Sequence, residues 1–119
     1  MIRVGVLGAQ GRMGSLVCQA VEAADDLELV AQVDEGDPRS DLVAAAVQVV
    51  VDFTHPDVVL DNLRYALDHG VAVVVGTSGF TEERLEQVRG WLAERPGNVL
   101  VAPNFGIGAV LMMQFARQA

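Results

Sequence analysis

The sequence predicts an α/β fold in which helices cover both faces of a parallel sheet. Short apolar runs alternate with helical patterns along the chain, and the first run, residues 2–7, passes directly into a glycine-rich turn and a helix. Such alternation is typical of a right-handed, doubly wound parallel sheet. With 119 residues, 51% of them hydrophobic, the chain has the size and composition of one domain with a substantial core.

The expected strands are apolar runs bounded by turn residues, at residues 2–7, 27–33, 47–53, 71–75 and 98–102. The second run ends at Asp34, and the Gly, Pro and Asp content of residues 35–40 predicts a loop. The third run is almost continuously apolar, which is typical of a parallel strand covered on both faces. The strands are therefore expected to form one buried sheet.

The expected helices lie between these strands, at residues 11–24, 41–46, 56–69 and 81–95, and a last one begins at Ile107. Pro56 suits a first helical turn, Gly70 suits a helix end, and Thr81 suits a cap. An apolar stripe is expected on the first helix, with Cys18 beside it as a buried small hydrophobe. The stripe consists of Leu16, Val17, Ala20, Val21 and Ala24. The buried side of the third helix is expected to consist of Val59, Leu60, Leu63, Ala66 and Leu67.

The turn after the first strand reads Gly8-Ala9-Gln10-Gly11-Arg12-Met13-Gly14. Gly8 is expected to form the tight turn, Gly11 to let phosphates approach the backbone, and Gly14 to let helix and strand pack closely. Free N–H groups at the helix start would then face a pyrophosphate. The spacing is GxxGxxG rather than GxGxxG, but the strand and helix on either side support the motif. The alternative is a glycine-rich turn that serves packing alone.

Asp34 ends the second strand twenty residues after Gly14, where a carboxylate can accept hydrogen bonds from ribose hydroxyls. A carboxylate there repels a 2′-phosphate and favours NADH. Arg12 lies in the glycine turn and Arg39 in the loop after Asp34, and either could pair with such a phosphate. The sequence therefore permits both NADH and NADPH. We interpret Arg39 as a solvated loop side chain. The alternative for Asp34 is a solvated carboxylate at a strand end.

Composition argues against several other functions. The net charge is −8, with 16 acidic residues against 8 basic ones, and no basic stripe suited to nucleic acid is present. The sequence has no run of about 18 apolar residues, so it predicts no membrane span. It has no basic leader, so it predicts no signal peptide. One cysteine excludes an internal disulfide, and with two distant histidines it makes no metal site. We expect a cytoplasmic protein.

Four segments together resemble the N-terminal domain of the 4-hydroxy-tetrahydrodipicolinate reductases (dihydrodipicolinate reductases). They are the glycine turn, Asp52-Phe53-Thr54-His55-Pro56, Gly76-Thr77-Ser78-Gly79-Phe80 and Ala102-Pro103-Asn104-Phe105-Gly106-Ile107-Gly108. The similarity covers the whole chain. Ser78 stands where the family usually has a second threonine, which keeps the hydroxyl. The resemblance implies an oxidoreductase of lysine and diaminopimelate biosynthesis that reduces a cyclic dicarboxylate with NADH or NADPH.

The resemblance also implies roles for individual residues. Gly8, Ala9, Gln10, Gly11, Arg12 and Met13 would hold the pyrophosphate, and Asp34 the adenosine ribose. The nicotinamide end would be surrounded by Phe53, Thr54, Gly76, Thr77 and Ser78 and closed by Ala102, Pro103, Asn104 and Phe105. No catalytic residue is expected in this chain, because the family's catalytic histidine and lysine lie in a second domain. Residues 1–119 would thus be the dinucleotide-binding (Rossmann) domain, inactive alone, with the helix at about 107–119 leading into that second domain. The full-length enzyme is expected to be a homotetramer.

Two further expectations concern His55 and the alternative function. His55 has no base partner at useful spacing, so we interpret it as structural or as lining the cofactor crevice. A non-catalytic nucleotide- or CoA-binding sensor with the same fold is the alternative function, since fold alone does not fix function. Asp34 and the Gly76-Thr77-Ser78-Gly79 segment favour the reductase, because a CoA module has less need of that carboxylate.

Overall fold

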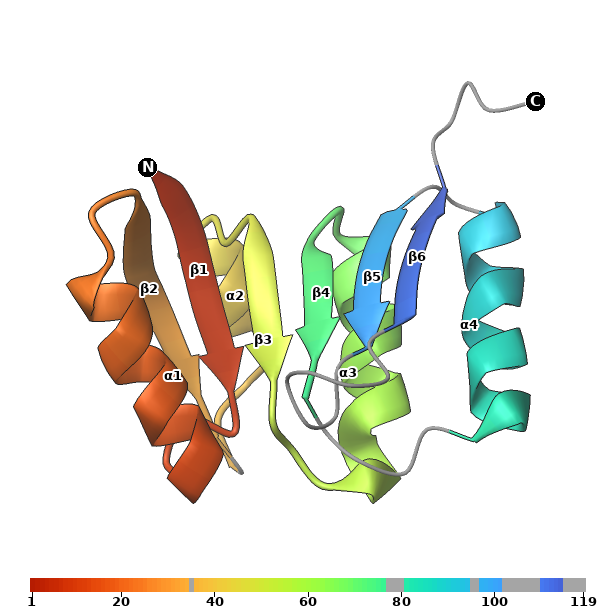
Figure 1. Cartoon of the computed structure of the whole chain (residues 1–119), viewed down its shortest axis with the longest axis horizontal. Coiled ribbons are helices and arrows are strands. Elements are labelled where there is room, and N and C mark those ends of the chain that lie inside the picture. The colour runs from red at the N-terminus through yellow and green to blue at the C-terminus, as the bar shows by residue number, and fades with distance from the viewer. Residues whose placement is uncertain (35, 77–80, 95–96, 102–109, 115–119) are drawn as a thin grey trace.

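The computed structural model describes residues 1–34, 36–76, 81–94, 97–101 and 110–114, the last of these as backbone only. Its elements alternate between strands and helices along the chain (Figure 1). They are β1 (Ile2–Leu7), α1 (Arg12–Ala23), β2 (Leu27–Val33), α2 (Ser40–Ala44), β3 (Val49–Asp52), α3 (Pro56–Asp68), β4 (Ala72–Val75), α4 (Glu82–Glu94), β5 (Gly97–Val101) and β6 (Val110–Gln114).

The strands form one sheet in the order β2-β1-β3-β4-β5-β6. Strands β1 to β5 are all parallel to their neighbours, which confirms the predicted fold class. The chain moves outward from β1 to β2, returns past β1 to β3, and then continues in the opposite direction. The strand order therefore reverses between β1 and β3, and ligands bind at such a reversal, beyond the carboxyl ends of the strands.

Strand β6 corrects the prediction of a helix from Ile107 onward. Its backbone pairs antiparallel with β5, and Val99 lies opposite Met112. Leu and Met favour helices in isolation. Pairing with β5 satisfies backbone groups that would otherwise form an open sheet edge, so tertiary context outweighs local propensity. Residues 107–109 and 115–119 of the predicted helix lie outside the described residues.

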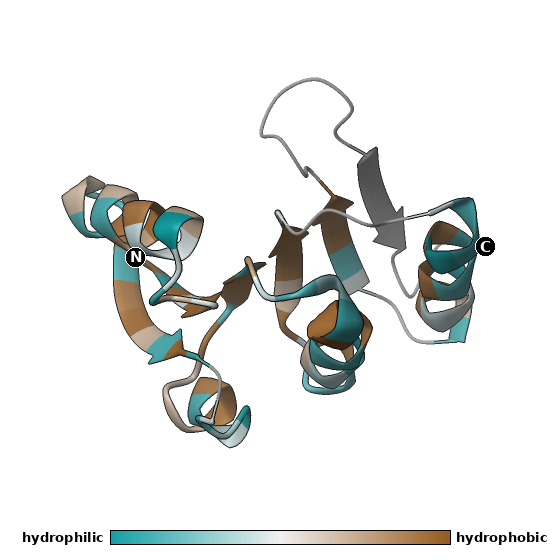
Figure 2. Cartoon of the chain, turned by 90° about the horizontal axis from the view of Figure 1, so that it is seen from below, coloured by the Kyte–Doolittle hydropathy of each residue, from teal (hydrophilic) through white to brown (hydrophobic). Residues whose placement is uncertain are grey.

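Alternate side chains of the strands face two separate parts of the core. Leu7 belongs to a large cluster with residues of α2, α3 and α4, whereas Val6 packs with Ala9 and Cys18 near α1. Figure 2 shows that the central strands are strongly hydrophobic and that the helices carry mixed surfaces. The sequence predicts that β3 is covered on both faces. On the α1 side, however, its residues Val49 and Val51 are only partly buried.

Helix α1 is rotated relative to the predicted apolar stripe. Its buried residues are Gly14, Cys18 and Val21, whereas Leu16 is 52% exposed and Ala20 is also exposed. Gly14 lies against the backbone of the glycine turn, and this contact sets which face of the helix turns inward. Residues four and seven positions after Gly14 then share its face. The predicted burial of Cys18 and Val21 is confirmed, and that of Leu16 and Ala20 is wrong.

The buried side of α3 agrees with the prediction except at two positions. Val59, Leu63, Ala66 and Leu67 are buried, but Leu60 is only partly so. The sequence interpretation missed Asn62, a polar residue 6% exposed among these apolar ones. A buried amide needs hydrogen-bonding partners, and its partners lie at the sheet edge described below.

Helix ends follow the predicted signals. Pro56 lies in the first turn of α3, and Gly70, at φ 73°, follows its last turn. Thr81 caps α4, because its Oγ1 accepts a hydrogen bond from the Arg84 N–H at 3.2 Å. Among the described elements, no helix is both long and apolar enough to cross a membrane.

The Cys18 thiol is expected to be unreactive in the native protein. Burial, together with the nearby carboxylate of Glu22, raises the pKa of the Cys18 thiol above its ordinary value, and only the thiolate reacts readily. Alkylation by iodoacetamide at neutral pH should be at least about 100-fold slower in the folded protein than in urea, because it must await opening of the helix. Mass spectrometry of the alkylated protein measures both rates. Equal rates would mean that α1 does not cover the thiol.

Candidate functional site

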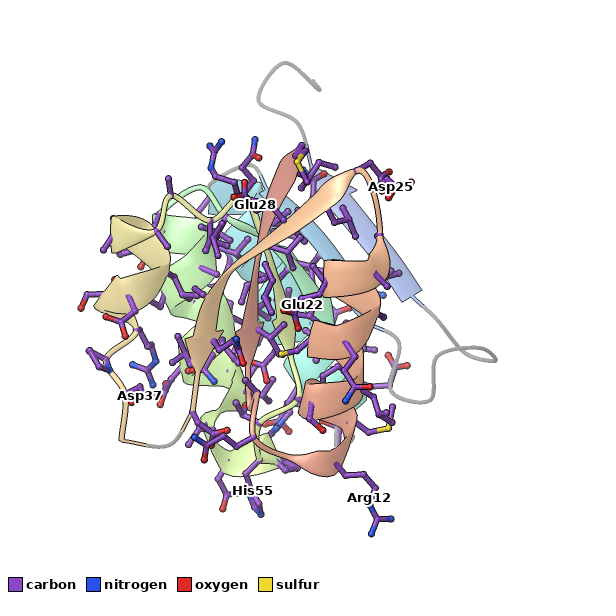
Figure 3. The ribbon with its side chains drawn as sticks, turned by 90° about the vertical axis from the view of Figure 1, so that its left-hand side faces the viewer. Arg12, Glu22, Asp25, Glu28, Asp37 and His55 are labelled. Carbon is purple, nitrogen blue, oxygen red and sulfur yellow. The ribbon has the colours of Figure 1, made fainter. Side chains whose placement is uncertain are left out.

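A pocket of about 820 Å³ opens at the carboxyl ends of β1, β2 and β3, where the strand order reverses. Its walls come from the glycine turn after β1, the loop after β2 and the segment between β3 and α3. The lining residues are Leu7, Gly8, Gly11, Val33, Asp34, Gly36, Asp37, Pro38, Arg39, Phe53, Thr54, His55, Asp57, Val58 and Asn62. In Figure 3, Arg12, Asp37 and His55 lie at this end of the molecule, whereas Asp25 and Glu28 lie at the opposite end.

Gly8 and Gly14 are glycines because the fold leaves no room for a side chain. Gly8 has φ +78°, and a Cβ there would lie 2.7 Å from the carbonyl oxygen of Phe53. A Cβ on Gly14 would lie 1.9 Å from the carbonyl oxygen of Gly8. The tight turn and the close approach of helix to strand, predicted for these two residues, are therefore both present.

Gly11 differs from the other two glycines of the turn. Its φ of −70° and ψ of 170° suit any residue, and a Cβ would lie 3.4 Å from the nearest atom, an ordinary contact. Nothing within the described fold thus requires a glycine here. Gly11 nevertheless lines the pocket and is the N-cap of α1, with no side-chain hydrogen bond to the helix start. The position is left open on the side where a ligand would approach.

The first turn of α1 presents backbone N–H groups at the pocket edge. The first hydrogen bond into the helix runs from the Ser15 N–H to the Gly11 carbonyl at 2.9 Å. The N–H groups that precede it have no intrahelical acceptor, as at every helix start. The side chains of Arg12 and Met13 are exposed and do not line the pocket, and in Figure 3 Arg12 projects away from the body of the molecule.

Asp34 joins the loop after β2 to the glycine turn. Its Oδ2 accepts a hydrogen bond from the Gln10 N–H at 2.6 Å. Asp37 closes the loop, since its N–H donates to the Asp34 carbonyl at 2.9 Å and its Oδ2 accepts from the Asp34 N–H at 3.0 Å. The half-buried Asp34 carboxylate is thereby held at the pocket wall by main-chain contacts.

Asp52, behind the pocket, forms a buried polar pair with Asn62, which lines it. Asp52 is 0% exposed, and its Oδ1 accepts hydrogen bonds from the N–H and Oγ1 of Thr54 at 2.8 and 2.6 Å. Asn62 Nδ2 donates to Asp52 Oδ2 at 3.2 Å and to Thr54 Oγ1 at 3.1 Å. The segment after β3 is therefore fixed by side chains of both β3 and α3. The signal that the sequence interpretation overlooked is a lone amide at helical spacing within an apolar face.

The interpretation of Arg39 as a solvated loop side chain is wrong. Its side chain is half-buried in the pocket wall, and its Nε donates to Asn62 Oδ1 at 2.7 Å. The loop content of residues 35–40 indicated no such contact, because the partner lies 23 residues later on α3.

Phe53 and Gly76 bring the ends of β3 and β4 together. The Gly76 N–H donates to the Asp52 carbonyl at 2.8 Å, and a Cβ on Gly76 would lie 2.2 Å from the Phe53 ring. The Phe53 ring therefore packs on the backbone of Gly76. Of the other predicted site residues, Ala9 is a buried member of the turn and packs with Val6 and Cys18. Thr77, Ser78, Ala102, Pro103, Asn104 and Phe105 lie outside the described residues.

His55 caps α3 and lies at the pocket rim, which agrees with the prediction that it is structural or lines the crevice. Its Nδ1 accepts a hydrogen bond from the Asp57 N–H at 3.1 Å and so caps α3. The ring is 71% exposed at the pocket rim. The exposed carboxylate of Asp57 lies beside the ring, with its Oδ2 3.4 Å from Nδ1.

Comparison with known proteins gives one consistent result. A family profile described as "Dihydrodipicolinate reductase, N-terminus" matches residues 2–105. The chain is 60% identical to a 4-hydroxy-tetrahydrodipicolinate reductase of Nocardia farcinica over 119 residues, which are 99% of this chain and 48% of that protein. A protein of the same name from Mycobacterium sp. strain KMS is also 60% identical, with 99% and 49% covered. The chain thus spans about half the length of the curated relatives it matches.

A solved structure supports the same relationship. The dipicolinate-bound dihydrodipicolinate reductase of Paenisporosarcina sp. TG-14 superposes with a TM-score of 0.76 at 32% identity, over 91% of this chain and 49% of that one. The family profile covers most of the chain, and the pocket lies at the strand reversal typical of this fold. The chain belongs to the dihydrodipicolinate reductase family and corresponds to its N-terminal part.

Proposed function

We propose that this chain binds a nicotinamide dinucleotide and is the cofactor-binding domain, residues 1–119, of a 4-hydroxy-tetrahydrodipicolinate reductase. The observation that carries the proposal is Gly11. The described fold has room for a side chain at this position, yet the residue that lines the pocket at the start of α1 is a glycine. A ligand that must approach the backbone closely explains the missing side chain, and a pyrophosphate at a helix N-terminus is such a ligand.

The rest of the pocket suits the same ligand. Backbone groups from Gly8 to Met13 would receive the pyrophosphate, and Asp34 would accept hydrogen bonds from the adenosine ribose. Phe53, Thr54 and Gly76 would form the nicotinamide end, with Thr77, Ser78, Ala102, Pro103, Asn104 and Phe105 around it. When bound, the dinucleotide would supply a hydride. The role of this chain is to orient the cofactor and to hold the segment after β3 in place through the Asp52–Thr54 hydrogen bonds.

The reaction itself belongs to a longer protein, because the chain spans about half of its relatives. The substrate would be a cyclic dicarboxylate, as the names of the relatives suggest, and the resemblance implies that it belongs to the lysine and diaminopimelate pathway. Groups that protonate the substrate are expected in a second domain, so this chain alone is not expected to turn over. A homotetramer of the full-length protein and a cytoplasmic location form part of the proposal.

We further propose that both NADH and NADPH are accepted, with NADH bound at least as well. The Asp34 carboxylate suits two free ribose hydroxyls and repels a 2′-phosphate. The loop after β2 also carries an arginine in the pocket wall, which offsets that repulsion.

Titration of the chain with NADH and with NADPH tests the proposal. Binding is measured by the fluorescence of the reduced nicotinamide and by calorimetry. Saturable binding of either dinucleotide supports the cofactor role. Binding of coenzyme A without binding of either dinucleotide would favour the sensor module instead. A folded chain that binds none of the three would contradict the proposal.

Replacing Asp34 with asparagine separates its two roles. The amide oxygen can still accept from the Gln10 N–H, so the turn should keep its shape, but the charge that receives the ribose hydroxyls is lost. NADH affinity should fall about tenfold or more, since hydrogen bonds to charged groups are the stronger ones. NADPH affinity should fall less, because the repulsion of the 2′-phosphate is also removed. Calorimetric titration of the variant with both dinucleotides checks this, and an equal loss for the two would remove Asp34 from the ribose site.

A further inference from the structure

Arg84 connects the starts of α3 and α4, the two helices that follow the proposed nicotinamide end in the sequence. Its Nη1 donates a hydrogen bond to the Pro56 carbonyl at 2.8 Å, and the side chain is half-buried. Arg84 lies in the first turn of α4, where its N–H also donates to Thr81 Oγ1 at 3.2 Å. The first turns of α3 and α4 both lie at the edge of the sheet where the parallel strands end (Figure 1).

The carbonyl that Arg84 binds lies between residues of the pocket wall. His55 and Asp57, on either side of Pro56, line the pocket, and so does Thr54. Arg84 is not among the described residues that line it. Arg84 can therefore act on a ligand only through the segment whose carbonyl it binds.

Residues of β3 and α3 anchor the same segment independently. Asp52 Oδ1 accepts from the Thr54 N–H at 2.8 Å, and Asn62 Nδ2 donates to Thr54 Oγ1 at 3.1 Å. These bonds fix Thr54 relative to its own strand and helix, but not relative to α4. The bond from Arg84 supplies that second anchor, so the starts of the two helices keep a fixed spacing.

An arginine at this position goes against the usual charge preference of helix starts. The first turn of a helix favours acidic side chains, and Asp57, Glu82 and Glu83 follow that preference. Arg84 brings a cation to the first turns of two helices, and it forms no ion pair with any residue that the structure describes. Its charge-assisted hydrogen bond from α4 to a carbonyl of α3 accounts for the arginine better than helix charge does.

We propose that Arg84 is a positioning residue for the nicotinamide end of the dinucleotide. By holding the first turn of α3 against α4, it keeps Phe53 and Thr54 in the arrangement that receives this end of the ligand. Less order must then be gained on binding. The inference rests on the proposed dinucleotide function and deepens it. The adenosine end would lie at Asp34 and should not depend on Arg84.

The test compares NADH with ADP-ribose, which has the adenosine, the pyrophosphate and the second ribose but lacks the nicotinamide ring. Calorimetry gives the dissociation constant of each, and their ratio reports the contribution of the ring. Arg84→Met keeps an apolar side chain and removes the donor. Arg89→Met, also on α4, removes an arginine that pairs with Glu86 outside the pocket lining and is the matched control.

Arg84→Met should lower the affinity for NADH about threefold to tenfold, because the released segment must be ordered again when the nicotinamide binds. ADP-ribose should bind within about 1.5-fold of its affinity for the unmodified chain. Arg89→Met should leave both affinities unchanged.

Hydrogen exchange in the absence of ligand gives a second readout. The Val58 N–H donates to the His55 carbonyl at 3.0 Å and closes the first turn of α3. In Arg84→Met this amide should exchange about threefold faster or more, since the turn opens locally more often. The Ala24 N–H, which donates to the Val21 carbonyl at the end of α1, should exchange at the same rate as in the unmodified chain. Nuclear magnetic resonance measures both rates.

Several outcomes would overturn the inference. Unchanged NADH affinity or unchanged exchange of Val58 in Arg84→Met would mean that this contact does not hold the segment for the ligand. An equal loss for NADH and ADP-ribose would mean that Arg84 serves the whole pocket or the fold. Equal affinity of the unmodified chain for the two ligands would leave the nicotinamide end without a contribution to position. If the unmodified chain binds neither, the proposed dinucleotide function itself fails, whereas the exchange of Val58 still reports whether Arg84 holds α3.

Discussion

Replacing Gly14 with alanine is expected to destabilise the chain by at least about 3 kcal/mol, at the upper end of the usual cost of overpacking a core. The added Cβ would lie 1.9 Å from the carbonyl oxygen of Gly8 and 2.7 Å from its carbonyl carbon. Both atoms belong to the backbone of the turn, so no side chain can rotate away to relieve the clash. Either α1 moves off the sheet or the turn after β1 deforms.

Urea unfolding followed by circular dichroism measures the effect of Gly14→Ala. The matched control is Gly90→Ala, also within a helix, where a Cβ would meet nothing within 4 Å. Alanine at that position should stabilise the chain by up to about 1 kcal/mol, because glycine is a poor helix former. A Gly14→Ala variant as stable as the unmodified chain would mean that α1 does not pack this closely on the turn.

Replacing Gly11 with valine is expected to lower the affinity for the dinucleotide about 100-fold or more. The free energy of unfolding is expected to change by less than about 1 kcal/mol. The backbone of Gly11 already has dihedral angles that valine adopts, and its Cβ position makes only an ordinary contact. A branched side chain would, however, occupy the mouth of the pocket where the pyrophosphate must approach the N–H groups of α1.

The same titration with NADH and NADPH, combined with urea unfolding, separates the two effects. Gly11→Ala provides a graded control, with a smaller loss of affinity than Gly11→Val because the added group is smaller. If Gly11→Val binds both dinucleotides within about twofold of the unmodified chain, the phosphates do not approach the backbone at this residue. A large loss of stability would instead mean that Gly11, like Gly14, is required by the fold.

These two substitutions test two different roles of the glycines in one motif, packing of the fold and approach of a ligand. Gly8 and Gly14 are required by the geometry of strand, turn and helix. Gly11 has no such requirement in the described fold, and the proposed pyrophosphate would account for a glycine at this position. The three glycines are indistinguishable as letters of the motif, and only the distances around each of them show which one the fold can exchange.

The sequence by itself determined the order of strands and helices as far as β5, since the apolar runs and the helix-end signals at Pro56, Gly70 and Thr81 are local. It also placed Asp34 and Thr54 at the carboxyl ends of parallel strands, and these ends meet at one edge of a sheet whatever the details of packing. The motifs of the resemblance identified the family, because they occur in the right order along the whole chain.

Tertiary structure alone decided the remaining features, because each depends on residues far apart in the sequence. The contact of Gly14 with the turn set the rotation of α1 and exposed Leu16, which helical periodicity placed inside. Pairing with β5 made residues 110–114 a strand although their composition favours a helix. The bond from Arg39 to Asn62 spans 23 residues, and it turned an apparently solvated loop arginine into part of the pocket wall. Local patterns report the propensity of neighbouring residues, whereas these outcomes depend on which distant backbone or side-chain groups the fold brings within bonding distance.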